Sequence, residues 1–488
     1  MVAGRYGRDM DHAALVRRLE KLQRLLEVAR AMTAERHLPA LLETINDAAA
    51  GVAEADRCSI FVVDRERREL WTTVAHGTGE IRIPLGAGIA GAVAASGAAI
   101  RIPDAYADPR FNQEVDASTG YRTRNILCVP MLNTQGEPVG VIQALNRRDG
   151  DFGDEDEELL QALAGPAASA IENAVLHEEI ERLFEGFVQA SVTAIESRDP
   201  TTAGHSGRVA TLTVGLARAV EQAPPPDWRG VRFEAAALQQ LRYAALLHDF
   251  GKVGVRENVL TKADKLQPHQ LELLKGRFEL ARAGLENDRL RARLAGRDEA
   301  NVEERLAELD ALLEVVLVAN RPAVLAEAAS AKLAELAGRT FTDPRGQPRQ
   351  LLTGDELHLL SIPKGSLSED ERREIESHVT HTFRFLSQIP WTRTLRRVPE
   401  IAYGHHEKLD GHGYPRSVAA PAIAVETRMM TISDIFDALT ASDRPYKKAL
   451  PVERALDILG DEAKRGQVDR SLFGVFVESR PWLLRPAP

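Results

Sequence analysis

The chain has 488 residues, of which 44% are apolar and 27% are charged, and its formal net charge is −10. These proportions are typical of a soluble globular protein with about two or three domains, and they exclude a wholly disordered, collagen-like or disulfide-stabilised chain. Because the net charge is negative, no general basic field attracts nucleic acid or an anionic membrane. An anionic ligand would therefore need a metal or a few local Lys and Arg residues.

Neither the start of the chain nor its longest uncharged run predicts a membrane-directed protein. The first residues lack the apolar core of a signal peptide. Residues 83–100 are uncharged but mostly Ala and Gly, which predicts a buried helix rather than a membrane span. The two cysteines, Cys58 and Cys128, fit a reducing cytosol and exclude a thiolate zinc site. We expect a cytoplasmic protein that binds neither membrane nor nucleic acid.

An amphipathic helix is predicted over residues 1–37. Its apolar residues recur in alternating steps of four and three, the spacing of a coiled coil. They are Leu15, Leu19, Leu22, Leu26 and Ala29. The pattern favours a short helix that joins two copies of the chain into a homodimer, and the alternative is a helix folded against its own domain.

Short strands are predicted from about residue 57 onward. The runs CSIFVVD, LWTTVAH and IRIPL are β-rich and separated by charged turns, and NILCVPML and VIQALN form a hairpin around a polar loop with Gly136 and Pro138. A helix follows from Asp154 to about Ser197. We expect its last part, residues 177–197, to be a continuous connection to the next domain rather than a loose linker.

Two features stand out within residues 38–176, the stretch IPDAYADPRFNQEVDASTGYRTRNILCVP and a set of five signature residues. The signature consists of Asn146, Arg147, Phe152, Asp156 and Glu157. Through these two features, residues 38–176 resemble a GAF domain, a small-molecule-sensing α/β fold. The signature is typical of GAF domains that bind cyclic nucleotides, so the resemblance implies a pocket for cyclic AMP or cyclic GMP. The alternatives to cyclic nucleotide binding are another small ligand and a purely structural or dimerising role.

The chain after about residue 190 is predicted to be mostly helical. Within it, residues 268–350 contain long Leu, Ala, Glu and Arg stretches that predict an antiparallel helical hairpin with a break near Gly296. This segment has no His cluster and no phosphate-binding loop. We interpret it as a helical insertion rather than a second active site.

Histidines and aspartates are grouped in this second region. His248 and Asp249 end an apolar run, where burying a carboxylate beside an imidazole is costly unless a divalent metal compensates. The adjacent His405 and His406 and the helical Asp434 add further nitrogen and carboxylate ligands. A mixed set without thiolates favours a pair of iron or manganese ions over structural zinc. Two such ions clamp a phosphate diester and lower the pKa of a bridging water.

Five motifs follow one another in this second region. They are RDPTTAGHSGRVA, LLHDFGKVGV, HVTHTFRFL, GHHEKLDGHGYP and TISDIFDALTASDRPYKKA. Together they resemble the HD-GYP domain, a helical phosphohydrolase domain of bacterial signalling. The match runs from about residue 198 to 457, and we assign residues 198–488 to this domain. The predicted fold class is therefore multidomain, with an α/β GAF sensor followed by an all-α HD-GYP domain that contains a helical insertion.

The resemblance implies a role for each matching residue. The implied metal ligands are His205, His248, Asp249, His378, His405, His406 and Asp434. Asp249 would bridge both metals, and Lys252 would steady the scissile phosphate, which makes these two the catalytic residues. Tyr414, Arg444 and Lys447 would contact the substrate. A glutamate that holds a third metal in some members is replaced here by Thr201, so we expect two metals.

The implied function is hydrolysis of cyclic di-GMP to pGpG, to GMP or to both, regulated by the GAF domain. Two alternatives stay open. In the first alternative, the chain is a catalytically weak signalling module that binds a cyclic dinucleotide or docks onto a partner, such as a diguanylate cyclase, through the loop around Tyr414. In the second alternative, the chain hydrolyses a different substrate, such as another cyclic dinucleotide or a nucleotide monophosphate.

Overall fold

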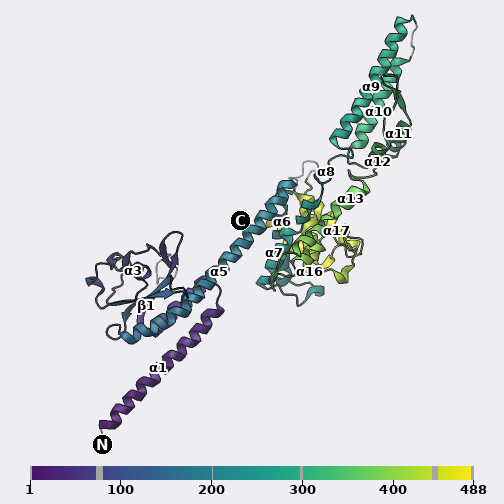
Figure 1. The fold of residues 1–488 in the computed structure, drawn as a ribbon. Helices are drawn as coiled ribbons and strands as arrows, with labels where there is room; N and C mark the ends of the chain where they lie inside the picture. Colours follow the sequence, from purple (N-terminus) through teal and green to yellow (C-terminus); the bar gives the residue numbers. More distant parts are fainter. Residues whose placement is uncertain are drawn as a thin grey trace. The chain divides into compact units, whose positions relative to one another are not determined.

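The computed structural model describes residues 3–72, 81–199, 202–296, 301–343, 345–441 and 449–484. The chain divides into two compact units, residues 1–185 and 186–488. The first unit is built around a β-sheet and the second is mainly helical (Figure 1). This confirms the predicted fold class, a multidomain chain with an α/β unit followed by a helical unit.

The first unit contains a six-stranded antiparallel sheet in the order β3-β2-β1-β6-β5-β4. Its strands are β1 (Ala55–Asp64), β2 (Glu69–Thr72), β3 (Ile81–Pro84), β4 (Ile100–Ile102), β5 (Ile126–Leu132) and β6 (Pro138–Arg147). The predicted hairpin is confirmed as β5 and β6. Its loop is closed by Asn133, whose side-chain oxygen accepts hydrogen bonds from the backbone N–H groups of Gln135 and Glu137.

Helices cover both faces of this sheet because successive strand residues point to opposite sides. Ile60 of β1 packs in a core with α2 (Leu38–Val52) and the first part of α5 (Asp154–Arg198). The next residue, Phe61, packs on the other side against α3 (Gly88–Ser96). The middle of the Gly/Ala-rich run, Gly88–Ser96, is thus a buried helix, as predicted, whereas the two ends of the run lie in β3 and at the start of β4. The N-terminal helix α1 spans Ala3–Ala34.

The second unit begins within α5. Its helices are α6 (His205–Gln222), α7 (Ala235–Leu247), α8 (Glu257–Leu260), α9 (Pro268–Leu294), α10 (Val302–Asn320), α11 (Glu327–Ala337), α12 (Gly354–Leu360), α13 (Glu369–Glu376), α14 (His378–Leu386), α15 (Val398–Tyr403), α16 (Val425–Thr440), α17 (Val452–Lys464) and α18 (Arg470–Ser479). A 3₁₀ helix, η4 (Phe250–Gly254), follows α7. No helix in the described ranges is long and apolar enough to cross a membrane.

The insertion has its own hydrophobic core, formed by α9, α10, α11 and α12. The sequence predicted only the hairpin of α9 and α10, which lie side by side (Figure 1). It did not predict α11 or the small hairpin of β7 (Thr340–Thr342) and β8 (Pro348–Gln350). The base of the insertion is closed by the fully buried Lys265, whose ammonium group donates to the carbonyl oxygen of Leu360 at 3.0 Å.

Candidate metal centre

The seven predicted metal ligands come from five places in the second unit. His205 and His378 are the first residues of α6 and α14. His248 and Asp249 follow α7, His405 and His406 follow α15, and Asp434 lies in the middle of α16.

The structure brings all seven together. Three overlapping groups of side chains have their ligand atoms within 4.8 Å of one another. These groups are His205, His248 and Asp249; His248, His405 and Asp434; and His378, His405 and His406. Across the part of the chain that the structure describes, no other His, Cys, Asp or Glu belongs to such a group. The arrangement is therefore a candidate metal centre of nitrogen and carboxylate ligands.

Three of the histidines are held in the same way. Each Nδ1 lies within hydrogen-bonding distance of the backbone carbonyl oxygen three residues earlier. The pairs are His248 with Ala245 at 2.7 Å, His378 with Ile375 at 2.5 Å, and His405 with Ala402 at 2.7 Å. Because a carbonyl can only accept, each Nδ1 donates, and the lone pair of a neutral ring is left on Nε2. All three Nε2 atoms are buried without a hydrogen-bond partner, which is the state required of a metal ligand.

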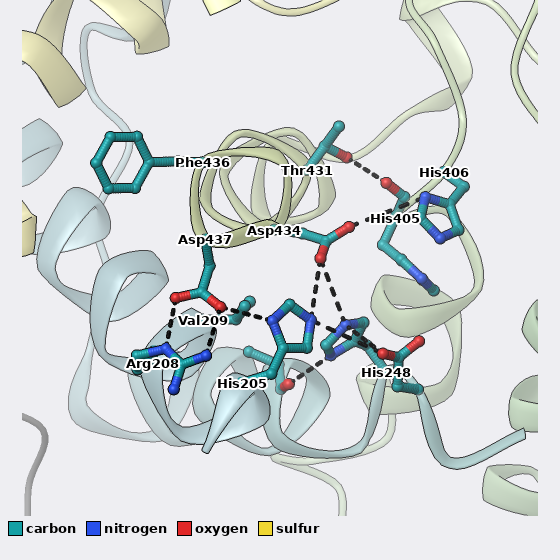
Figure 2. A network of polar contacts seen from close by, with 12 residues as sticks. His205, Arg208, Val209, His248, His405, His406, Thr431, Asp434, Phe436 and Asp437 are labelled. Carbon is teal, nitrogen blue, oxygen red and sulfur yellow. Dashed lines mark hydrogen bonds and ion pairs between the residues drawn. The ribbon is translucent and has the colours of Figure 1, made fainter. Parts of the chain in front are cut away.

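Two carboxylates lie among these rings. Asp249 is 3.3 Å from Nε2 of His378 and 3.5 Å from Nε2 of His248. Asp434 is 3.2 Å from Nε2 of His205 and 3.9 Å from Nδ1 of His406 (Figure 2). Each aspartate therefore lies between histidines of different groups, as a ligand shared by two ions would.

Both carboxylates are ionised despite their burial. Burial would raise the pKa of Asp249, but the Lys252 ammonium and the nearby histidines hold it well below its usual range. Burial would also raise the pKa of Asp434, and His205 outweighs it, so this pKa too is strongly lowered. The centre thus carries buried negative charge that a divalent cation would neutralise.

The histidines differ in protonation. Burial lowers the pKa of His248 and His405, and it lowers the pKa of His406 to about 4, so these rings are neutral at neutral pH. Burial also acts against protonation of His205, but hydrogen bonds to Asp434 and Asp437 outweigh it and raise its pKa to about 9.

Lys252 and Tyr414, two predicted substrate contacts, border the centre. The Lys252 ammonium is 2.8 Å from Asp249 and 3.5 Å from Asp199. Burial opposes its charge, yet these carboxylates raise the pKa of Lys252 above its usual value. The ring of Tyr414 lies 4.8 Å from that of His406, and burial raises the pKa of its hydroxyl, which stays protonated. The other predicted contacts, Arg444 and Lys447, lie outside the described residues, as does Thr201.

Sequence reasoning missed residues that hold the ligands in place. Asp437 contacts His205, Arg208 donates to Asp437, and the hydroxyl of Thr431 donates to the carbonyl oxygen of His405 at 2.9 Å. The sequence signal that could have found these residues is their helical spacing from the predicted ligands. Asp437 and Thr431 each lie three residues from Asp434 on α16, and Arg208 lies three residues after His205.

The predicted GAF signature holds the end of β6 to its surroundings. Asn146 accepts a hydrogen bond from the N–H of Arg124 at 2.6 Å and donates to the carbonyl oxygen of Arg122 at 2.9 Å. Arg147 is paired with Asp156 at 2.8 Å. The other two signature residues also make contacts within the fold. Phe152 is buried in the core, and Glu157 is paired with Arg101 at 3.0 Å.

A separate cavity of about 390 Å³ lies on the α3 side of this unit. Its lining includes Arg57, Phe61, Arg110, Asp116, Thr123 and Gln143. None of the five signature residues is part of the lining that the structure describes. The signature is therefore a structural support near the cavity, and any ligand would be contacted by other side chains.

Comparison with known families identifies both units. The GAF domain family matches residues 37–171, and two families described as HD domain match residues 202–319 and 351–472. The two HD matches contain the seven residues of the candidate metal centre.

Two curated relatives are named as 3′,5′-cyclic phosphodiesterases. "Probable 3′,5′-cyclic phosphodiesterase pde-5" of Caenorhabditis elegans is 33% identical over 195 residues, which is 37% of this chain and 26% of the relative. "Dual 3′,5′-cyclic-AMP and -GMP phosphodiesterase 11A" of Takifugu rubripes is 39% identical over 140 residues, which is 26% of this chain and 16% of the relative. The chain thus spans about a quarter or less of each relative's length.

Solved structures also resemble part of the chain. The GAF domain of a phosphoenolpyruvate-protein phosphotransferase from Coxiella burnetii has 22% identity and a TM-score of 0.30, covering 33% of this chain and 98% of that domain. A free methionine-R-sulfoxide reductase from Neisseria meningitidis has 21% identity and a TM-score of 0.28, covering 32% of this chain and 91% of that protein. From the family matches, this chain contains a GAF domain followed by an HD domain.

Proposed function

We propose that the chain is a metal-dependent phosphodiesterase of the HD-GYP type, which hydrolyses cyclic di-GMP to pGpG, to GMP or to both. The observation that carries this proposal is the convergence of three buried, partnerless Nε2 atoms on two ionised aspartates. Such a site has little structural purpose without a cation, because it leaves buried polar groups uncompensated.

The residues fit two divalent ions, iron or manganese. His205, His248 and Asp249 would hold one ion, and His378, His405 and His406 would hold the other, with Asp249 and Asp434 between them. Neutral imidazoles and carboxylates suit these metals. When bound, the ions would act as Lewis acids on a phosphate oxygen and lower the pKa of a water ligand.

Side chains at the edge of the centre would orient the substrate. The Lys252 ammonium, kept charged by Asp249 and Asp199, would bind a non-bridging phosphate oxygen and stabilise the charge that develops there. The protonated hydroxyl of Tyr414 would donate a hydrogen bond to the substrate. Arg444 and Lys447 would contact its phosphates and bases.

The choice of substrate rests on the sequence motifs GHHEKLDGHGYP and SDRPYKKA. A second candidate is a cyclic mononucleotide, because the names of two curated relatives state that those proteins are 3′,5′-cyclic phosphodiesterases. A further cyclic dinucleotide, and a weakly active module that docks onto a diguanylate cyclase through the Tyr414 loop, are the other outcomes that an assay must distinguish.

The test is a substrate panel. Purified protein is loaded anaerobically with iron, separately with manganese, and incubated with cyclic di-GMP, another cyclic dinucleotide, cyclic GMP or cyclic AMP before products are resolved by chromatography. We expect linear pGpG or GMP from cyclic di-GMP only. Cleavage of cyclic GMP or cyclic AMP alone would support the second candidate, and metal-loaded protein that cleaves none of the four would contradict enzymatic function.

We propose that the GAF domain, residues 38–176, regulates the activity of the HD-GYP domain, residues 198–488. The regulation would pass through the connecting segment, residues 177–197. A cyclic nucleotide in the 390 Å³ cavity is the proposed signal. Titration with cyclic GMP and cyclic AMP, monitored by calorimetry and by turnover, tests both parts. Binding without a change in turnover would remove the regulatory part.

We also propose that α1 contributes to a homodimer. Leu25 and Met32 are buried against their own unit, whereas Leu19, Leu22 and Leu26 are 53%, 42% and 65% exposed. An exposed apolar stripe of this spacing favours pairing with a second copy. Light scattering should give a dimer for the parent chain and a monomer for a Leu22→Glu, Leu26→Glu variant. A monomeric parent chain would contradict the proposal.

A further inference from the structure

His205 is oriented differently from the other buried histidines of the centre. Whereas the Nδ1 atoms of His248, His378 and His405 face backbone carbonyls, Nδ1 of His205 lies 2.7 Å from Oδ2 of Asp437. The side chains of His205 and Asp437 are each 5% exposed. Figure 2 shows His205 contacted by Asp437 on one side of its ring and by Asp434 on the other.

Arg208 fixes the carboxylate that holds His205. Its Nε donates to Oδ1 of Asp437 at 2.7 Å, and its Nη2 donates to Oδ2 at 3.1 Å. A third nitrogen, Nη1, donates to the carbonyl oxygen of Ala203 at 3.0 Å. Such a two-pronged pair fixes both oxygens of the carboxylate and so determines which of them faces the imidazole.

The helices supply these residues in register. Arg208 follows His205 by one turn on α6, and Asp437 follows Asp434 by one turn on α16. Each helix therefore carries one residue that faces the centre and one that supports it from behind. Because Asp437 accepts from Nδ1, the position open to a metal is Nε2, which lies beside Asp434 and Asp249 and would offer its lone pair once its proton is displaced.

A carboxylate does more to an imidazole than a backbone carbonyl does. It fixes the tautomer, and its full negative charge also makes Nε2 a stronger electron donor toward a metal. From this geometry we infer that Asp437 and Arg208 form a positioning pair that acts through His205 and strengthens metal binding at the group of His205, His248 and Asp249. The inference rests on the proposed function, since it presumes a metal there.

The test compares Asp437→Asn with a matched control. Asn preserves the size of the side chain but removes the charge. The control is Asp469→Asn, because Asp469 is also buried and paired with an arginine on a neighbouring element, Arg428 of α16, at 3.0 Å. Asp469 belongs to none of the metal-binding groups found among the described residues. Both changes remove the charge of a buried carboxylate that is paired with an arginine in the same unit.

The primary readout is Mn²⁺ binding to full-length apoprotein by calorimetry, with the absorption spectrum of the Co²⁺-loaded protein as a second readout. For Asp437→Asn we expect one class of Mn²⁺ site to weaken by roughly 10–100-fold, with an altered Co²⁺ spectrum, and partial recovery in Asp437→Glu. Arg208→Met should weaken the same class of site by less. Asp469→Asn should bind both metals as the parent chain does.

Each other result is decisive. Unchanged Mn²⁺ affinity in Asp437→Asn would overturn the inference, and so would an equal loss in Asp469→Asn, because the effect would then be general destabilisation. If Asp437→Asn does not fold, Arg208→Met and Asp437→Glu carry the same comparison. A parent chain that binds no metal would instead overturn the proposed function, which keeps the two failures distinct.

Discussion

The hydroxyl of Thr382 on α14 donates a hydrogen bond to the backbone carbonyl oxygen of His248 at 2.9 Å. The same hydroxyl accepts from the backbone N–H of Gly251 at 2.8 Å. One buried side chain thus ties the segment that carries His248 and Asp249 to the helix that begins with His378. The tie therefore links two of the segments that carry candidate metal ligands.

Replacing Thr382 with valine should therefore destabilise the HD unit. The shape is preserved, but a buried carbonyl and a buried N–H lose their partner, at a cost of about 1–3 kcal/mol in the free energy of unfolding. Urea denaturation of the apoprotein measures this. Thr382→Ser keeps the hydroxyl and should lose much less. Equal stabilities of the two variants would show that the tie contributes nothing.

Gly251 is needed for the close approach of η4 to α14. A Cβ atom at this position would overlap with the carbonyl oxygen of His378 and the backbone nitrogen of Thr382. Gly251→Ala should cost about 1–3 kcal/mol through overpacking and should displace His378 from Asp249, weakening Mn²⁺ binding.

The matched control for this prediction is Gly207→Ala. Gly207 lies inside α6, and an added Cβ there would meet nothing within 4 Å. Alanine should therefore stabilise the helix by about 0.5–1 kcal/mol. Calorimetric titration with Mn²⁺ compares the metal affinities of the two variants. Normal Mn²⁺ affinity in Gly251→Ala would contradict the packing argument.

The raised pKa of His205 predicts how the apoprotein responds to pH. Its pKa is about 9 in the folded state and near 6.5 when unfolded, so the folded state binds the proton more tightly. The resulting stabilisation is fully present below about pH 6.5 and is lost as the pH rises through about 9. We expect His205→Gln to be less stable than the parent at pH 6 and to approach it by pH 9.5. Urea denaturation in chelator tests this, and a difference that grows with pH would contradict it.

Metal removal should destabilise the HD unit. An ion that binds only the folded state adds about 2.7 kcal/mol to the free energy of unfolding when its concentration is 100 times its Kd. Scanning calorimetry with Mn²⁺ or with chelator should show this shift in the parent chain. His405→Ala should lose it, while His412→Ala, a change at an 85% exposed side chain, should keep it. Equal shifts in both variants would place the metal elsewhere.

The GAF signature and the cavity should respond differently to mutation. Asn146 is buried at a positive φ of 54° and makes several hydrogen bonds, so Asn146→Ala should destabilise the GAF unit by about 2 kcal/mol or more. Gln143 lines the cavity, so Gln143→Ala should weaken cyclic nucleotide binding at little cost in stability. Calorimetry measures both. A stable Asn146→Ala variant with weakened binding would assign the signature to the ligand instead.

The sequence predicted those parts whose signal is local. His248 and Asp249 could be predicted as metal ligands because the dipeptide ends an apolar run and ordered motifs surround it, and the structure places both in the candidate metal centre. The Asn133 loop was predicted as a hairpin turn because its Gly and Pro are local turn signals. The fold class followed from the resemblance of the two regions to GAF and HD-GYP domains, and the change from strand-like to helical spacing between them agreed with it.

The parts that were missed depend on contacts between distant segments. Asp437 looks like any polar residue on a helix until α6 places His205 and Arg208 against it. Thr382 acquires its role only because η4 packs on α14. The strands β7 and β8 have three residues each, which is too short for a periodic pattern to develop.

The central claim is that the converging histidines and aspartates form a metal centre that cleaves a phosphodiester. The most direct measurement is the rate of linear product formation from cyclic di-GMP by the parent chain and by Asp249→Asn, each with its bound metal counted. The account predicts turnover by the parent chain and a loss of at least about 10³-fold in Asp249→Asn, in protein that remains folded. Full turnover by Asp249→Asn would contradict it.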